Sequence, residues 1–441
     1  MKKIFFASLS LLATCTIHAG VYTFKMADAP ADAKVVLKWM ADGTRTVIDV
    51  KDGVAVKDTA AFAPQYVSVS CGRMLRGTLF LSPDKNLTVS ISQDKKEITG
   101  DAPLASINSY LLNTKFGYLN YQVAGRDEQD FINVCDSLYK ADREKLFAAK
   151  LPESFTKLDE QRLLYTSYAI FPMYKPYHEY VAKTKDFMPT KAYFDLLDRL
   201  AVSDASLLPV PGYKEYVENA VRAHVAVMPG DDEAAKLESA LNSVLTDATV
   251  KASVVHTCAY EKIYSSGLDS NDSFVALHKK YVSDADLVSA FNDVCGKWGR
   301  LRVGMSSPAF SCPDIEGKTV TLESLRGKLV YIDVWATWCG PCRGELPHLE
   351  KLEESYAGKD IHFVSISCDQ NKAAWEKMVR EKNMKGIQLY GGSKMQFMDD
   401  YLINGIPRFI LLDREGRIVK ADAPRPSNPD TPKLFDEWLC K

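Results

Sequence analysis

The sequence predicts three regions in series: a small antiparallel β domain, a mainly helical region and an α/β domain. Apolar and polar residues alternate with a period of two over residues 20–100, whereas apolar residues recur every three or four positions over residues 101–298. Over residues 299–441, strongly apolar runs alternate with amphipathic segments. This last pattern is typical of a sheet covered by helices on both faces.

Length, charge and hydropathy indicate a protein of several domains and exclude some classes of function. At roughly 150 residues per domain, 441 residues fit two to four domains. The 55 Lys and Arg residues nearly balance 57 Asp and Glu, which excludes the broad basic surface of a nucleic-acid-binding protein. No apolar run reaches about 18 residues, so we expect no membrane span after processing.

Residues 1–19 have the features of a signal peptide. Lys2 and Lys3 precede the mostly apolar run Ile4–Ala13, and Ala19 is the small residue before the expected cleavage point. We therefore expect export to the periplasm or cell envelope, where disulfides persist.

An alternative is a lipoprotein signal. The run Leu12-Ala13-Thr14-Cys15 resembles a lipoprotein box, although Thr14 departs from the small residues usual there. A membrane tether is expected only if Cys15 is lipidated, and export without lipid is the favoured interpretation.

The β domain is predicted from one apolar run, Val35–Met40, and three runs in which apolar and polar residues alternate. Asp42-Gly43 marks a turn between the first two, and Ser82–Asn86 is interpreted as a hairpin loop. The predicted strands are Val35–Met40, Val47–Val50, Tyr66–Ser70 and Leu87–Ser92.

The helical region contains four clear amphipathic segments and many tyrosines. We expect the tyrosines to pack in the core and between helices; a peptide-binding groove is the alternative. The predicted helices are Asp127–Ala149, Tyr213–Val227, Asp231–Leu245 and Asp284–Trp298, and the tyrosines include Tyr165, Tyr168, Tyr174, Tyr177 and Tyr180.

In the α/β domain, strands and helices alternate after a glycine-bearing linker. The predicted strands are Lys328–Trp335, Ile361–Cys368, Arg408–Asp413 and Arg417–Ala421. The predicted helices are Glu345–Tyr356, Lys372–Lys382, Lys394–Leu402 and Lys433–Leu439.

The motif Cys339-Gly340-Pro341-Cys342 follows the first of these strands and opens a helix. Unpaired N–H groups and the positive dipole end of the helix favour a thiolate at Cys339. Cys342 is close enough in sequence to form a small disulfide ring with Cys339. Cys339 can thus attack a disulfide, and Cys342 can resolve the mixed disulfide.

A zinc site and an inert disulfide are the alternatives. Zinc needs a second ligand pair, but no second CxxC or HxxxH occurs, and His256 and Cys258 do not share a helix face. We expect no metal and no cofactor.

Several motifs around this dithiol resemble those of the TlpA/ResA-type thioredoxin-like thiol–disulfide oxidoreductases. They are Gly304–Phe310, Asp314–Lys318, Leu322–Lys328 and Trp338–Cys342, and the resemblance covers Val303–Leu439. It implies a thioredoxin-like fold and an exported protein that reduces disulfides in other proteins, including during cytochrome c maturation. The β region similarly resembles, in pattern, the β domains that precede thioredoxin modules in secreted Bacteroidetes proteins.

The resemblance also implies roles for single residues. Asp333 matches the buried acid that takes a proton from the second cysteine, and Glu345 matches a glutamate beside the active site. Pro407, after Ile406, matches a cis-proline that positions substrate. Trp338, Gly340, Pro341 and Ile406 are expected to contact substrate, with Trp338 partly exposed and Trp335 in the core.

The remaining cysteines are not assigned to the reaction. Cys312 and Cys368 are interpreted as packed thiols. Pairing of Cys135 with Cys258 or Cys295 stays open, because connectivity cannot be deduced from sequence.

We therefore expect an exported protein disulfide reductase with disulfide-containing client proteins and a membrane thiol-electron donor. Gly340-Pro341 carries no cation to over-stabilise the thiolate, which favours a reductant. The alternatives are a non-enzymatic adaptor, whose first 300 residues select a partner, and a thiol peroxidase.

Overall fold

The computed structural model describes residues 20–58, 62–92 and 95–441. The predicted signal peptide, with Cys15, lies outside the described residues. The chain divides into two compact units at Val254 and Val255, and each is described by itself. Within the described part of the chain, no helix is both long and apolar enough to cross a membrane.

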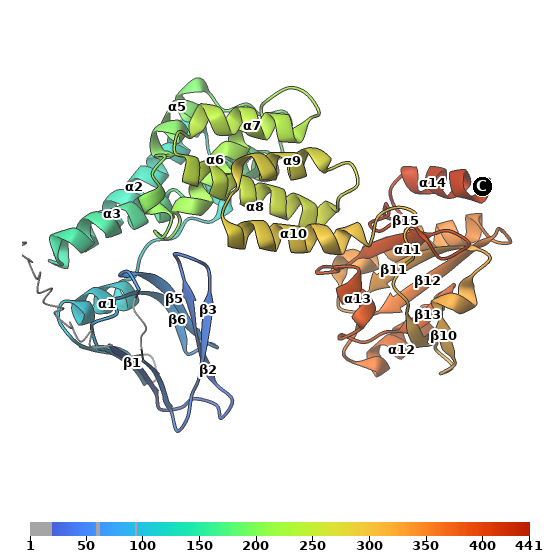
Figure 1. The fold of residues 1–441 in the computed structure, drawn as a ribbon, viewed down its shortest axis with the longest axis horizontal. Helices are drawn as coiled ribbons and strands as arrows, with labels where there is room; N and C mark the ends of the chain where they lie inside the picture. The colour runs from blue at the N-terminus through green and yellow to red at the C-terminus, as the bar shows by residue number, and fades with distance from the viewer. Residues whose placement is uncertain (1–19, 59–61, 93–94) are drawn as a thin grey trace, which may run out of the picture. The chain divides into compact units, whose positions relative to one another are not determined.

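Eight strands at the start of the first unit form two four-stranded sheets (Figure 1). The sheet β3-β2-β5-β6 is antiparallel throughout, as predicted, whereas the sheet β4-β1-β7-β8 contains one parallel pair, β1 with β7. The strands are β1 (Val21–Met26), β2 (Lys34–Trp39), β3 (Arg45–Asp49), β4 (Val54–Asp58), β5 (Gln65–Cys71), β6 (Leu75–Leu81), β7 (Leu87–Ser92) and β8 (Lys95–Gly100).

The loop Ser82–Asn86 is not a hairpin, so that prediction was wrong. Strand β6 pairs with β5, and β7 pairs with β1 and β8, so the loop carries the chain from one sheet to the other. Alternate residues of both sheets, such as Phe24, Leu37 and Val89, are buried in one shared core. Burial of one face thus explains why apolar residues alternate along each strand. The alternation does not show which strands pair with each other.

Helices α1 to α8 follow the two sheets in the chain. Predicted helices are confirmed at α2, α6 and α7, and Asp127 and Asp232 cap α2 and α7 by accepting hydrogen bonds from backbone N–H groups. The helices are α1 (Leu104–Asn113), α2 (Glu128–Ala148), α3 (Glu153–Ser167), α4 (Tyr174–Ala182), α5 (Lys191–Leu200), α6 (Tyr213–Val225), α7 (Glu233–Val244) and α8 (Ala248–Ser266), which continues into the second unit.

The tyrosines of this region differ in burial, and Tyr177 is half-buried. Tyr165, Tyr168 and Tyr174 are buried, which confirms the predicted packing role. Tyr180 is 72% exposed, so for this residue the packing prediction was wrong. Its ring lies against that of Tyr121 at the surface.

A buried ionic network ties the β domain to the helices. Asp159 on α3 is fully buried and accepts hydrogen bonds of 2.8 Å from the hydroxyl groups of Tyr66 on β5 and Tyr110 on α1. Arg162, one turn later, donates to the same carboxylate through Nε at 2.5 Å and Nη2 at 3.0 Å. Each charge therefore has its partner inside the protein.

We predict that Asp159→Ala lowers the free energy of unfolding by about 3–5 kcal/mol, because Arg162 is then a buried charge without a counter-charge. Denaturation followed by far-ultraviolet circular dichroism measures the change. The control is Glu153→Ala, which removes an exposed ion pair with Lys157 on the same helix and should cost less than about 1 kcal/mol. Equal losses in both variants would contradict the account.

The second unit holds the end of α8, two further helices and the α/β domain. Its five-stranded sheet has the order β13-β12-β11-β14-β15. Strands β11, β12 and β13 are parallel, β14 is antiparallel to β11, and β15 is antiparallel to β14. The strands are β9 (Ser311–Pro313), β10 (Thr319–Thr321), β11 (Leu329–Trp335), β12 (Ile361–Ser367), β13 (Ile387–Tyr390), β14 (Arg408–Leu412) and β15 (Ile418–Lys420).

All seven residues of β11 are buried, so both faces of the sheet are covered, as predicted. Helices α11 and α14 pack through Leu349 and Phe435 on the face that bears Tyr331, and α12 packs through Trp375 near Trp335. The helices are α9 (Asp272–Tyr281), α10 (Ala285–Gly299), α11 (Gly340–Ser355), α12 (Lys372–Glu381), α13 (Gln396–Asp400) and α14 (Asp430–Leu439).

Candidate active site

The two cysteines of the motif lie where β11 passes into α11. They form a disulfide, and the Cys339 Sγ also accepts a hydrogen bond of 3.1 Å from the backbone N–H of Cys342. Cys339 is thus the N-cap of α11. Pro341 fits the first turn because an N–H group there would have no partner within the helix. The helix end is therefore built to stabilise negative charge on Cys339 once the disulfide is reduced.

A buried carboxylate holds the loop before Cys339. Asp369, which follows β12, accepts hydrogen bonds from the backbone N–H of Thr337 at 2.9 Å and from its hydroxyl at 2.6 Å. Ser367 donates a further bond to Asp369 at 2.8 Å. Since β12 runs parallel to β11, both strands end at this edge of the sheet, and Asp369 fixes the turn that presents Cys339.

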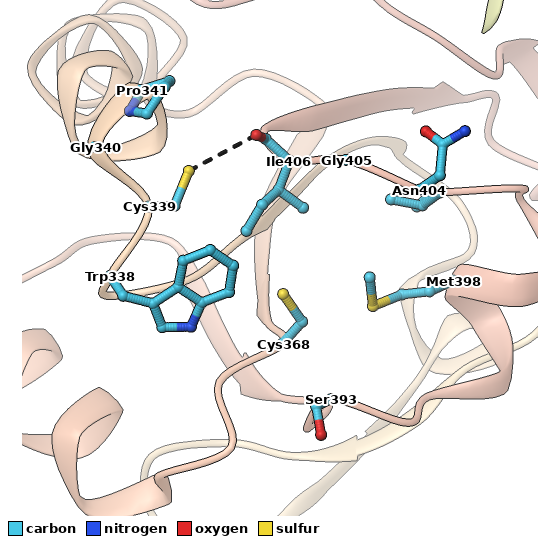
Figure 2. A pocket seen from close by; sticks show the side chains of 11 residues that line it. Trp338, Cys339, Gly340, Pro341, Cys368, Ser393, Met398, Asn404, Gly405 and Ile406 are labelled. Atoms are coloured by element: carbon cyan, nitrogen blue, oxygen red, sulfur yellow. Dashed lines mark hydrogen bonds between the residues drawn. The ribbon is translucent and has the colours of Figure 1, made fainter. Parts of the chain in front are cut away.

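Pro407 reaches the disulfide through strand pairing. Arg408, the first residue of β14, is paired with Val334 near the end of β11, and this register brings the preceding residues beside the motif. The Ile406–Pro407 peptide bond is cis, as the resemblance implied. The Ile406 carbonyl oxygen lies 3.8 Å from the Cys339 Sγ, as the dashed line in Figure 2 marks.

A mainly apolar groove of about 490 Å³ opens beside Cys339. Figure 2 shows the Trp338 ring, the Ile406 side chain and the sulfur atoms of Cys368 and Met398 around it. Trp338 is 68% exposed, which confirms the expectation that this side chain is partly exposed. Burial, helped by Asp369, raises the pKa of the Cys368 thiol to about 11, so this thiol stays protonated near neutral pH.

Asp333 is the buried acid of the central strand. It is 4% exposed, and its Oδ1 atom has no hydrogen-bond partner among the described residues. Burial raises its pKa to about 8, and the charges of Glu345 and Glu353 on α11 act in the same direction. Asp333 lies two residues after Tyr331 and so shares its face of β11, the face on which α11, the helix that carries Cys342, packs.

Comparison with known proteins identifies the C-terminal part. The Redoxin family matches residues 302–436. The thiol-disulfide oxidoreductase ResA of a Bacillus cereus strain is 29% identical over 27% of this chain and 69% of its own length. A solution structure from Bacteroides vulgatus, described as a putative thiol-disulfide oxidoreductase, is 65% identical over 32% of this chain and 93% of that one, with a TM-score of 0.29. The chain belongs to the thioredoxin-like thiol–disulfide oxidoreductases.

A third relative of this oxidoreductase comes from Chlorobium tepidum. Its crystal structure, described as a putative thiol:disulfide interchange protein DsbE, is 26% identical over 32% of this chain and 99% of that one, with a TM-score of 0.29. Family membership thus rests on the C-terminal third of the oxidoreductase, which is the part that carries the disulfide.

The structure places the predicted site residues of the oxidoreductase around one edge of the sheet, and their roles stay predictions. Glu345 is buried and accepts hydrogen bonds from the Ser427 N–H at 3.0 Å and hydroxyl at 2.9 Å, so it ties α11 to the segment before α14. Asp369 was missed by sequence reasoning. The signal available was a polar Ser-x-Asp step directly after an apolar strand.

The cysteines described outside the motif form no disulfide. Cys312 and Cys368 are buried thiols, which confirms their prediction as packed side chains. Cys135 is a buried free thiol in the first unit.

We predict that Asp333→Asn makes stability less dependent on pH. The folded protein holds the Asp333 proton up to pH about 8, whereas an unfolded chain releases it near pH 4. Wild-type stability should therefore fall, relative to the variant, as pH rises from 5 to 8, by on the order of 4 kcal/mol.

Chemical denaturation of the oxidised proteins, followed by tryptophan fluorescence, measures this difference; of the six tryptophans, only Trp39 lies outside the second unit. The control is Asp399→Asn, which changes an exposed carboxylate on α13 outside the core. Parallel stability curves for wild type and Asp333→Asn would contradict the assignment.

Proposed function

We propose that this protein is an exported reductase of disulfides in client proteins. The observation that carries the proposal is the placing of Cys339 at the start of α11, 3.8 Å from the Ile406 carbonyl and at the edge of an open apolar groove. A client chain lying in that groove would bring its disulfide to Cys339. An inert structural disulfide needs neither a groove nor a helix end aimed at its first sulfur.

The reaction consists of two thiol–disulfide exchanges. The Cys339 thiolate attacks one client sulfur, the client disulfide breaks, and its other sulfur leaves as a thiolate that takes up a proton. Asp333 accepts the proton of the Cys342 thiol, and the resulting thiolate attacks the Cys339 sulfur. The second client thiolate leaves and is protonated, so two electrons have passed to the client and Cys339–Cys342 is oxidised.

Each further turnover needs a reductant. Gly340-Pro341 places no cation between the cysteines to over-stabilise the thiolate, and this supports a reducing role. In an oxidising compartment, the Cys339–Cys342 disulfide must be reduced by a dithiol electron donor, which we assign to the membrane. Export itself rests on the signal-like residues 1–19.

In this proposal, the β domain and the helical region select the client protein. The β domain and helices precede the redox domain and contain none of the groups used in the exchange, so they are available to bind a client. Clients of the cytochrome c maturation type are proposed from the family resemblance alone.

We predict that Cys342→Ala traps the client. Without the resolving thiol, the mixed disulfide between Cys339 and the client should persist, because no neighbouring thiolate can attack it. Non-reducing electrophoresis of exported protein, followed by mass spectrometry, should identify the trapped partners. The controls are Cys339→Ala, which lacks the attacking thiol, and Cys312→Ala, which removes a buried thiol outside the motif. If Cys342→Ala captures no more protein than Cys339→Ala, the reductase proposal is wrong.

A further inference from the structure

A second cleft adjoins the Pro407 loop. It has a volume of about 630 Å³, and Gly405 lines both this cleft and the apolar groove beside Cys339. Pro407 and Arg408 form one wall of this cleft, and Lys420, Asp422 and Arg425 line it as well. A chain that crosses the loop at Gly405 can therefore contact both depressions.

Arg408 is the unusual group in this cleft. Its side chain is only 9% exposed, and its Nη1 atom is buried without a hydrogen-bond partner among the described residues. Asp422 Oδ1 lies 3.4 Å from Nη1, too far for a strong charge-assisted bond, and the Asp422 side chain is 51% exposed. Guanidinium groups stay charged at all physiological pH values, so this buried donor lacks a close acceptor.

Two further cations are free to act with Arg408. Lys420 and Arg425 are exposed, and neither side chain has an ion-pair partner in the part of the chain that the structure describes. Three cations and the single carboxylate of Asp422 give the lining a formal charge of 3 − 1 = +2. The chain as a whole carries −2, so this local excess is not part of a general basic surface.

The walls of the cleft are also held in place. The pairing of Arg408 with Val334 fixes one wall to the central strand. Ser427, which lines the opposite side, is held by both oxygens of Glu345 on α11. The cleft is thus attached to the two elements that carry the cysteines, and a ligand in it would be positioned relative to Cys339.

We propose that this basic cleft binds an acidic side chain of the client protein, close in sequence to the client cysteine that Cys339 attacks. The inference rests on the proposed function. A client carboxylate in the cleft would be attracted by the excess positive charge of Arg408, Lys420 and Arg425, and it suits the planar guanidinium fork. Because Arg408 is only two residues from Ile406, and an extended chain advances about 3.3 Å per residue, the acidic residue should lie within a few residues of the client cysteine.

The test uses three disulfide-bridged peptides that are identical except at one position near the cysteine. That position is Glu in the first peptide, Gln in the second and Lys in the third. The fully reduced protein is mixed with each peptide, and the single-turnover rate is measured by acid quench and thiol alkylation. We expect the Glu peptide to react about three- to tenfold faster than the Gln peptide at low salt, and the Lys peptide to react slowest. The preference should shrink at high salt.

Variants of the cleft residues test whether the preference for the Glu peptide arises in the cleft. Arg408→Met and the exposed double change Lys420→Gln with Arg425→Gln should both bring the Glu-to-Gln rate ratio to about 1; the second keeps the test valid if the first misfolds. The control Arg417→Gln removes an exposed cation of the same strand region outside the cleft and should keep the ratio.

The outcomes separate the two proposals. If the peptides are reduced at equal rates, or if the Glu preference survives in the double variant, the cleft assignment is wrong and the reductase proposal stands. If no peptide is reduced at all, the reductase proposal fails, and the cleft assignment fails with it.

Discussion

The candidate site is assembled around the carboxyl end of strand β11. All seven residues of this strand are buried, so its position is fixed by packing on both faces. The strand leads directly into the Cys339 turn, its parallel neighbour β12 supplies Asp369 to hold that turn, and its antiparallel neighbour β14 brings Pro407 beside the disulfide. The chemistry therefore depends on the register of three strands, because a shift of one residue would turn each side chain to the opposite face.

The same strand carries a group that opposes its own stability. A valine or isoleucine at position 333 would suit a strand buried on both faces, whereas an aspartate there must stay protonated or be ionised at a cost. Burial and the neighbouring glutamates hold the pKa of Asp333 at about 8, close to the pH at which a proton acceptor is useful. We interpret Asp333 as a residue that lowers the stability of the fold and provides a proton acceptor for the reaction.

Reasoning from the residues alone located the parts of the site that are neighbours in the chain, and the family resemblance added the distant Pro407. The strand, the CxxC turn and the helix are contiguous, so their order alone indicates a redox dithiol. Asp369 and Arg408 act only through strand pairing, and no local pattern shows which strands are adjacent. The same limit explains the error at Ser82–Asn86, where alternation gave the strands but not their partners.

The lifetime of the mixed disulfide tests the central claim most directly, namely that Asp333 takes the proton of Cys342. The reduced protein and Asp333→Asn are each mixed with a model disulfide, and the decay of the mixed species is followed across a pH range of about 6 to 9. The account predicts that decay in the wild type accelerates with an apparent pKa of about 8, and that Asp333→Asn decays at least about tenfold more slowly near neutral pH. Formation of the mixed disulfide should be little changed. Equal lifetimes across this pH range would contradict the account and make Asp333 a purely structural residue.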